Sequence, residues 1–341
     1  MKVVVTANIV PFMPGGADYH IKGVVEQLQA AGHEVETVRF PFRFSPESDI
    51  ETLMDYCDTL DLNRMNGIEI DKVISLQFPA YGVLHDNQTV WVMHQHRAVY
   101  ELYEQQVKTP AVEQLKRKVE AFDNRVLGRA KQLYANSGRV AERLKTYNGL
   151  SAEPLYHPPF MADTFFCEED YGYIFCPGRL ETLKRQDLLI EALRFCKTPV
   201  KAIIAGDGGQ RDTYQALVEQ YGLSDRVRLI GRFSEAEKFA YYARSLAVFF
   251  TPFDEDYGYI TLEAMLSGKP VVTCTDSGGP LEFVKHGETG FVMEPEPEQI
   301  AEVLDELYNN RTRSAEMGRA GRDSYFSQNI SWDNVVSKLL K

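Results

Sequence analysis

The sequence has no long apolar run. No stretch approaches the roughly twenty apolar residues that a membrane-spanning helix needs. The N-terminus, Met1 to Val5, enters strand-like sequence directly and lacks the charged region followed by an apolar region that a signal peptide has. We therefore expect a cytoplasmic protein.

Cysteine is also scarce. The five cysteines, which are scattered and show no C-x-x-C spacing, are Cys57, Cys167, Cys176, Cys196 and Cys274. An odd number without paired spacing is typical of reduced thiols and gives no support to a disulfide framework or a zinc site.

The chain has fewer basic than acidic residues, and its net charge is −12. A protein that binds a nucleic acid backbone needs a basic stripe, so we expect no nucleic acid partner. Residues 108–145 are a local exception, with ten basic and four acidic residues. A solvated helix face explains this excess most simply. The alternative is a weak peripheral contact with the anionic inner face of a membrane, or with a phosphorylated acceptor.

What the sequence does contain is a repeated alternation of strand-like and helix-like segments. This order predicts an α/β fold with parallel sheets covered on both faces. The predicted strands of the first half are 3–5, 34–39, 73–76, 90–93 and 132–134, and those of the second half are 173–176, 200–205, 227–230, 246–250, 271–274 and 290–292.

The length of 341 residues and the 44% hydrophobic content suit two domains with a core in each. The paired prolines Pro158 and Pro159 mark the boundary, because they stop regular structure. We predict domains at 1–160 and 161–326. A terminal segment, 327–341, would contain a helix over 332–340 capped by Ser331.

The turn after the predicted strand at 173–176 places Arg179 and Lys184 beside a helix start. Free N–H groups and the helix dipole attract anions there. Arg contributes a planar fork and Lys a compact charge, so the turn is suited to holding a diphosphate.

A second strand-to-helix turn follows at residues 251–265. Gly258 permits a tight backbone path, and a helix predicted to begin near Tyr259 directs further N–H groups outward. Glu263 falls on this helix among apolar neighbours. A partly buried carboxylate needs donors, which a structural salt bridge or the hydroxyls of a ligand would supply.

These motifs occur in a specific order along the chain. They are Pro177-Gly178-Arg179 with Lys184, Gly206-Asp207-Gly208, Glu255 and Glu263 separated by seven residues, Gly268 to Val272, and Gly278-Gly279. Gly15-Gly16, Gly32 to Val35, Trp91 to His94, Ala135 to Ser137 and Pro158-Pro159 stand in matching places of the first half. This order resembles the retaining family 4 glycosyltransferases (group 1), whose GT-B fold has two Rossmann-like domains facing across a cleft. The resemblance implies that 1–160 binds the acceptor, that 161–326 binds the nucleotide-sugar, and that the terminal helix in 327–341 crosses back to the first domain.

The resemblance implies roles for residues of the second half. Arg179 and Lys184 would stabilise the diphosphate, Glu255 would bind hydroxyls of the donor sugar, and Glu263 would bind the ribose hydroxyls. The other donor-binding residues implied are Gly206, Arg232, Phe233, Gly258, Tyr259 and Ile260, and Gly278 and Gly279 would shape the cleft wall.

In the first half, the resemblance implies that Gly15 and Gly16 let the backbone approach the diphosphate. His94 matches the active-site histidine of the family, and His96, two residues further on, is the alternative. Asn136-Ser137 suits either a ligand contact or an ordinary helix cap.

The resemblance also implies retention of configuration, transfer of a hexose-type sugar from a nucleotide diphosphate sugar, and a saccharide or lipid-linked acceptor. Arg179 and Lys184 would replace a metal, because the nearest acidic triplet, Asp254 to Asp256, lies in the loop assigned to the sugar. We therefore expect neither a metal site nor a cofactor. The first half offers no obvious carboxylate nucleophile, which favours attack on the same face as the departing phosphate over double displacement.

Other interpretations remain open. A sugar phosphorylase, a nucleotide-sugar epimerase or a non-catalytic nucleotide-sugar-binding homologue would share the fold. A dinucleotide-dependent oxidoreductase is disfavoured, because residues 7–11 lack the G-x-G-x-x-G pattern after the first strand. The sequence leaves the oligomeric state open.

Overall fold

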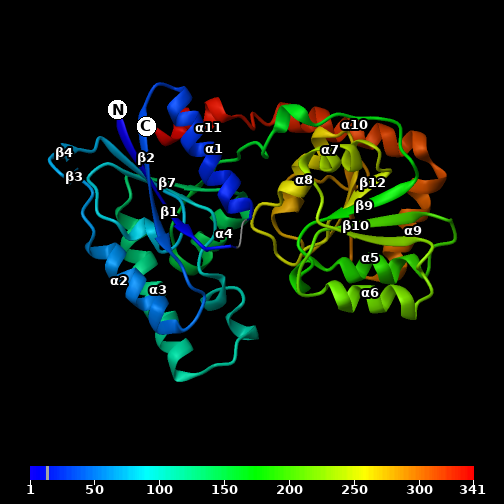
Figure 1. Cartoon of the computed structure of the whole chain (residues 1–341), viewed down its shortest axis with the longest axis horizontal. Helices are drawn as coiled ribbons and strands as arrows, with labels where there is room; N and C mark the ends of the chain where they lie inside the picture. The colour runs from blue at the N-terminus through cyan, green and yellow to red at the C-terminus, as the bar shows by residue number, and fades with distance from the viewer. Residues whose placement is uncertain (13–14) are drawn as a thin grey trace. The chain divides into compact units, whose positions relative to one another are not determined.

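The computed structural model describes residues 1–12 and 15–341. The chain divides into two compact units (Figure 1), unit 1 with Met1–Phe160 and Ser331–Lys341, and unit 2 with Met161–Ile330. Each unit contains one six-stranded parallel sheet. The predicted α/β fold with two parallel sheets is therefore confirmed.

The sheet of unit 1 has the order β2-β1-β5-β6-β7-β8. Its strands are β1 (Lys2–Ile9), β2 (Glu34–Pro41), β5 (Lys72–Ser75), β6 (Gln88–Val92), β7 (Gln132–Ala135) and β8 (Glu153–Pro154). The sequence predicts all of these except β8, a two-residue edge strand. A short antiparallel pair, β3 (Arg64–Met65) and β4 (Ile68–Glu69), was also not predicted.

Helices cover both faces of this sheet. They are α1 (Gly16–Ala30), α2 (Glu47–Thr59), α3 (Pro110–Arg129), α4 (Gly138–Asn148) and α11 (Trp332–Leu339). Strand β6 shows why both faces are apolar: Val90 and Val92 pack with the core beneath α2, α3 and α4, and Trp91 packs with α1 and α11. Such burial on both sides produces a continuous hydrophobic strand.

Helix α11 packs on α1 (Figure 1). The Ser331 side chain accepts a hydrogen bond from the Asn334 N–H at 3.3 Å, as the predicted cap requires. The Trp332 ring lies against Gly23 of α1, where a Cβ atom would approach the ring to 2.3 Å. The last helix of the chain thereby completes the core of unit 1.

The sheet of unit 2 has the order β11-β10-β9-β12-β13-β14. Its strands are β9 (Tyr173–Pro177), β10 (Lys201–Ala205), β11 (Val227–Gly231), β12 (Ala247–Phe249), β13 (Val271–Cys274) and β14 (Gly290–Met293). Every one of them coincides with a predicted strand. Because all strands of the sheet are parallel, the loops that follow β9 to β13 gather at its carboxyl edge.

The helices of unit 2 are α5 (Gln186–Leu193), α6 (Arg211–Gln220), α7 (Glu235–Ala243), α8 (Tyr259–Leu266), α9 (Pro297–Asn309) and α10 (Arg311–Ser327). Figure 1 shows α5 and α6 on one side of the sheet and α7 and α8 on the other. Helix α8 begins at Tyr259, where the sequence predicts a helix start.

All five cysteines are free, and Cys57, Cys176 and Cys274 are buried. Burial raises the pKa of the Cys57 thiol to about 12, and Asp58 adds to the shift. A buried thiol held in its neutral form behaves as a small apolar side chain. The three buried cysteines therefore act as structural side chains.

Candidate active site

Backbone hydrogen bonds connect the loops at the carboxyl edge of the unit 2 sheet. The Gly178 N–H donates to Ala205 O at 2.9 Å, and the Gly206 N–H donates to Gly231 O at 2.8 Å. A Cβ atom on Gly206 would lie 1.9 Å from Gly178 O, so no side chain fits there. Gly206 therefore contributes a close approach of two loops, which brings the turn with Arg179 to a fixed place on this edge.

Lys184 and Glu255 form an ion pair at this edge. Lys184 ends the short 3-10 helix Thr182–Lys184 after β9, and Glu255 lies in the loop after β12. About one fifth of each side chain is exposed. The Lys184 ammonium also lies 5.7 Å from the centre of the Phe250 ring. The structure thus brings together two of the predicted catalytic residues.

Arg179 lies in the same turn and is exposed. Among the described residues, its guanidinium has no hydrogen-bond or ion-pair partner. Its backbone is held, because Gln186 donates from Nε2 to Arg179 O at 3.0 Å. A cation on a fixed backbone with a free head group is available to an anionic ligand.

The loop that carries Glu255 runs alongside the loop after β13. The Glu255 N–H donates to Ser277 O at 3.0 Å, and the Gly279 N–H donates to Glu255 O at 2.8 Å. A Cβ atom on Gly278 would lie 2.5 Å from Glu255 O. Gly278 and Gly279 therefore permit the close approach that sets the backbone at Glu255.

Gly258 begins helix α8 in a left-handed conformation, with φ 84°. A Cβ atom there would also crowd Phe250 and Pro280 at 3.1 Å. Tyr259 and Ile260 begin the first turn of α8, where the Thr261 N–H donates to Gly258 O at 3.0 Å. Burial raises the pKa of Tyr259, and Glu263 adds to the shift. The phenol is therefore neutral at physiological pH.

Glu263 accepts a hydrogen bond from the Tyr242 hydroxyl at 2.6 Å and lies 3.5 Å from the Lys238 ammonium. Its side chain is 12% exposed. Burial disfavours the charge on Lys238, but Glu263 and Glu235 outweigh it, and the net pKa of Lys238 is raised. The structure thus supplies the donors that this carboxylate needs through an internal ion pair. The ribose-binding role of Glu263 stays a prediction.

Arg232 and Phe233 follow β11 at the same edge. The Arg232 side chain is 86% exposed and contacts Asp207 at 3.2 Å. Phe233 packs edge-on against Phe175, with the ring centres 6.2 Å apart. Phe233 is therefore partly held in the core, whereas Arg232 reaches into solvent.

The candidate residues of unit 1 lie at the carboxyl edge of its own sheet. His94 follows β6 by two residues, and its Nδ1 lies 2.8 Å from Gln95 O. His96 is enclosed by aromatic rings and stacks on Phe78 at 5.3 Å. Burial and the neighbouring His94 lower the pKa of His96 to about 4. His96 therefore has a packing role in this structure, which leaves His94 as the stronger candidate.

Gly15 and Gly16 start helix α1. The Gly15 N–H donates to the Asp18 carboxylate at 3.1 Å, and Asp18 also pairs with Arg39 at 2.7 Å. Among the described residues other than its chain neighbours, none has a heavy atom within 4 Å of a Cβ built on Gly15. At the start of α4, the Ser137 side chain accepts a hydrogen bond from the Val140 N–H at 3.1 Å, as an ordinary helix cap does.

Sequence reasoning missed several partners of these residues. Arg185 and Asp276 hold the loops around Glu255, and Lys238 and Tyr242 hold Glu263. The partners are far apart in the sequence, so no local pattern signals the pairing. The left-handed turn at Arg185 was equally hidden, because Gly is the usual signal for that conformation.

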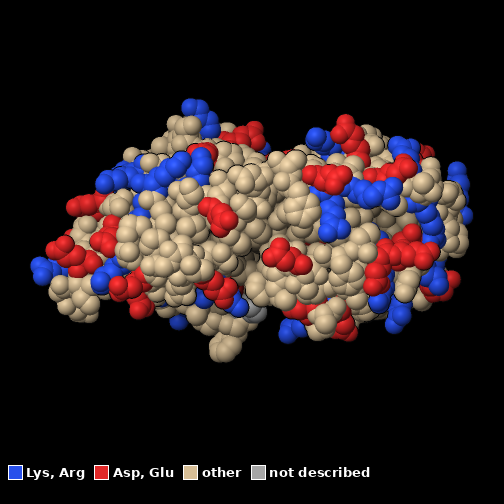
Figure 2. Space-filling view, turned by 90° about the horizontal axis from the view of Figure 1, so that it is seen from above, with Lys and Arg blue, Asp and Glu red and all other residues tan. Residues whose placement is uncertain are grey.

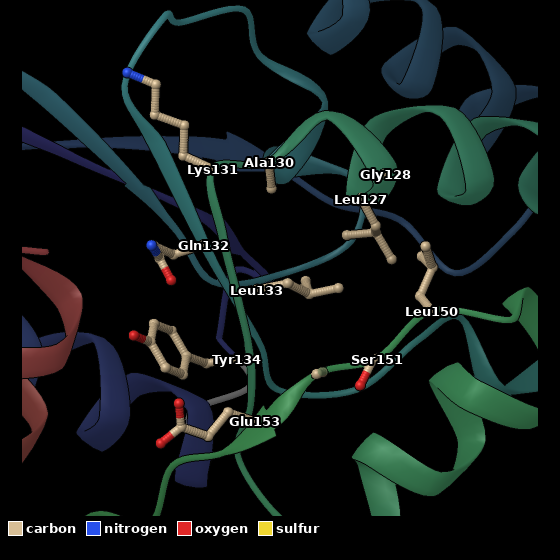
Figure 3. Close-up of a pocket in the computed structure, with 11 residues that line it drawn as sticks. Leu127, Gly128, Ala130, Lys131, Gln132, Leu133, Tyr134, Leu150, Ser151 and Glu153 are labelled. Carbon is tan, nitrogen blue, oxygen red and sulfur yellow. The ribbon is translucent and has the colours of Figure 1, made fainter.

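A groove of about 470 Å³ lies elsewhere, at the amino ends of β7 and β8 (Figure 3). Leu127, Leu133 and Leu150 point toward one another on one side of β7, and Gln132 and Tyr134 lie on the other. The groove contains none of the predicted site residues. It lies at the opposite edge of the sheet from His94.

In the described part of the chain, no three His, Cys, Asp or Glu side chains are grouped so that they could hold a metal ion. Over the same residues, no helix combines the length and the apolar content needed to cross a bilayer.

Comparison with known proteins gives a family for unit 2. Residues 164–324 match the family model described as glycosyl transferases group 1. The human alpha-1,3/1,6-mannosyltransferase ALG2 is 35% identical over 131 residues, which are 36% of this chain and 31% of that protein. The GDP-mannose-dependent alpha-(1-6)-phosphatidylinositol monomannoside mannosyltransferase of Mycobacterium tuberculosis is 32% identical over 178 residues, 49% of this chain and 46% of that protein. The chain spans less than half the length of these two relatives.

Solved structures match over nearly the whole chain. Anabaena HepE in complex with UDP-glucose aligns with a TM-score of 0.73 at 18% identity, over 99% of this chain and 98% of that one. Sucrose-phosphate synthase from Thermosynechococcus elongatus aligns with a TM-score of 0.77 at 16% identity, over 99% and 97%. At such identities the likeness shows the fold, and the two parallel-sheet units of this chain have the GT-B fold. Residues 164–324, nearly the whole of unit 2, match the group 1 glycosyltransferases.

Proposed function

We propose that the protein is a retaining, metal-independent glycosyltransferase. It would move a hexose from a nucleotide diphosphate sugar to a hydroxyl of a saccharide or lipid-linked acceptor. The observation that carries this proposal is the Lys184–Glu255 ion pair at the carboxyl edge of unit 2, with exposed Arg179 in the same turn. One cation and one carboxylate in contact match the two ends of such a donor, the diphosphate and the sugar hydroxyls.

The leaving group sets the chemical requirement. As the glycosidic bond breaks, negative charge develops on the diphosphate and must meet fixed positive charge or N–H donors. Lys184, Arg179 and the first turn of α8 supply both kinds of group, so the proposal requires no metal. Retention would follow from attack on the same face, with the departing phosphate accepting the proton of the acceptor hydroxyl. Trapping a covalent glycosyl-enzyme on an Asp or Glu would contradict this mechanism.

GDP-mannose is the first donor to test. The Mycobacterium tuberculosis relative is named for GDP-mannose, and it is 32% identical to this chain over 178 residues. UDP-glucose, which is bound in the Anabaena HepE structure, is the second. Both are nucleotide diphosphate hexoses and present the same charged groups to Lys184 and Arg179.

The basic segment, residues 108–145, bears on whether the protein contacts a membrane. Lys118 pairs with Glu51 at 2.5 Å and Arg125 with Asp58 at 2.6 Å, and both acidic partners lie in α2, outside the segment. Figure 2 shows one face of the molecule, on which Lys and Arg are interspersed with Asp and Glu. We propose a cytoplasmic protein whose membrane contact, if it forms, is weak and salt-dependent, since each cation near an anionic surface contributes only about 1 kcal/mol. Sedimentation with anionic vesicles at two salt concentrations tests this.

A donor-turnover assay tests the proposed function. GDP-mannose or UDP-glucose is incubated with the protein, saccharide or lipid-linked acceptors and EDTA, and release of the nucleoside diphosphate is measured. We expect release that depends on an acceptor and persists in EDTA. Release that requires inorganic phosphate would indicate a phosphorylase, and sugar isomerisation without an acceptor an epimerase. Binding without turnover of any kind would leave the non-catalytic homologue.

A further inference from the structure

Arg185 has an unusual backbone for a residue with a long side chain. It lies between Lys184 and helix α5 with φ 52° and ψ 44°, in the left-handed region. Asp254, the residue before Glu255, also has a positive φ, of 47°. Each member of the Lys184–Glu255 pair thus has a left-handed neighbour that is not glycine. Such conformations persist only where surrounding contacts hold them.

The contacts that hold Arg185 come from its own guanidinium. Nε donates to Thr251 O at 2.7 Å, and Nη2 donates to Pro252 O at 3.0 Å. Nη1 and Nη2 donate to the two carboxylate oxygens of Asp276 at 2.8 and 2.6 Å. The Arg185 side chain is only 17% exposed, and its guanidinium lies 5.8 Å from the centre of the Phe253 ring.

These partners belong to different loops. Thr251 and Pro252 follow β12 and lead to Glu255, while Asp276 follows β13. The backbone joins the same loops, because the Phe253 N–H donates to Leu183 O at 2.8 Å and the Asp254 N–H donates to Asp276 O at 2.9 Å. The guanidinium of Arg185 therefore connects the turn after β9 with the loops after β12 and β13.

We propose that Arg185 is a positioning residue that holds the loop of Glu255 against the turn of Lys184, so that both side chains face one donor molecule. This inference rests on the proposed function. This role requires no contact between Arg185 and the donor, because the planar fork of Arg185 engages a carboxylate and two carbonyl groups at once. A lysine carries the same charge but has no such fork, and it cannot reproduce this set of bonds.

The test uses the energetic coupling between Lys184 and Glu255. The dissociation constant of GDP-mannose, or of UDP-glucose if that binds more tightly, is measured by calorimetry for the parent, Lys184→Ala, Glu255→Gln and the double variant. In the natural sequence, we expect the effect of the double variant on the dissociation constant to differ by about tenfold from the product of the two single effects, as for other residues in contact. This factor is the coupling between Lys184 and Glu255. In the Arg185→Gly background we expect this coupling to fall below about twofold.

The variants are chosen so that a loss of coupling can be distinguished from misfolding. Glycine suits the left-handed backbone, so Arg185→Gly removes the guanidinium without adding strain. Arg185→Lys and Asp276→Asn leave most of the structure in place, and each is expected to lower the coupling in the same direction. Arg319→Ala, an exposed arginine of α10, is the matched control and is expected to leave the coupling unchanged.

The outcomes separate this inference from the proposed function. If neither donor binds the natural protein, the proposed function fails and the inference fails with it. If a donor binds and the coupling between Lys184 and Glu255 is the same in the Arg185→Gly and Arg185→Lys backgrounds as in the natural sequence, the proposed function stands and Arg185 has no positioning role. Loss of coupling in both, with Arg319→Ala unchanged, supports the inference.

Discussion

Lys184 and Glu255 are 71 positions apart in the chain and form an ion pair between the loops after β9 and β12. In this structure the Lys184 ammonium and the Glu255 carboxylate neutralise each other. We expect a donor that places its diphosphate on Lys184 to displace Glu255, whose carboxylate then becomes available to the sugar hydroxyls.

This exchange predicts opposite effects of Glu255→Gln on two ligands. Removing the carboxylate frees Lys184, so GDP or UDP without a sugar should bind more tightly, by about threefold to tenfold for a partly exposed pair. The intact nucleotide sugar loses a charged acceptor for its hydroxyls and should bind more weakly. Calorimetry with each pair of ligands measures both effects. Equal weakening of the two ligands would show that Glu255 does not compete for Lys184.

Arg179→Ala should reduce donor turnover by about a hundredfold, because one fixed donor to the leaving group is lost. Its guanidinium has no partner among the described residues, so the free energy of unfolding should change by less than about 0.5 kcal/mol. Turnover and chemical denaturation are measured on the same preparation. A large loss of stability would mean that the arginine holds the structure and would remove the case for a role in catalysis.

Tyr242→Phe should destabilise unit 2. The variant removes the hydroxyl that donates to Glu263 at 2.6 Å in a largely buried site. Hydrogen bonds to charged groups contribute about 1.5–3 kcal/mol, so faster hydrogen exchange is expected in peptides from α7 and α8. Lys238 stays beside Glu263, so the ion pair remains in the variant. Unchanged exchange in these peptides would contradict the structural role of the pair.

Acid should weaken unit 1 through His20. Burial lowers its pKa from 6.5 to about 3, and its ring stacks on His157 at 4.0 Å. The unfolded chain therefore binds a proton that the folded unit excludes, and His20 makes the free energy of unfolding fall as pH decreases from 6.5 to about 3. The expected slope is about 1.4 kcal/mol per pH unit, and His157, whose pKa is also lowered by burial and by His20, adds to it.

The two tryptophans, Trp91 and Trp332, both lie in unit 1, so their fluorescence reports its unfolding. Burial raises the pKa of Asp123 to about 6, which opposes the histidines between pH 4 and 6. Asp123 is present in both the natural protein and His20→Phe, so its contribution cancels when the two proteins are compared. The variant should lose less stability than the natural protein between pH 7 and 5, and parallel curves would show that His20 is not the group responsible.

The fold could be predicted from the sequence to a large extent, because strands buried on both faces produce short apolar runs between turn residues. Val271 to Cys274 is such a run and forms β13. Strand β8 escaped prediction, since two residues at a sheet edge carry no periodicity. The start of α8 was predicted because Gly258, which permits a tight backbone path, stands just before the helix-like segment.

The candidate site was predicted in its members but not in its internal contacts. Lys184 and Glu255 each stand in a recognisable turn, yet nothing in either segment indicates that they pair. Arg185 gave no signal at all, because its conformation depends on Thr251, Pro252 and Asp276, which only the folded sheet brings near. Contacts across loops depend on topology, and local patterns do not encode them.

The most direct measurement is calorimetric titration of GDP-mannose and UDP-glucose into the natural protein and into Lys184→Ala, each with and without EDTA. The account predicts that one donor binds the natural protein, that EDTA leaves its affinity unchanged, and that Lys184→Ala weakens it by tenfold or more, which is about 1.4 kcal/mol. Binding that EDTA abolishes, or that Lys184→Ala leaves intact, would contradict a diphosphate site built on fixed cations.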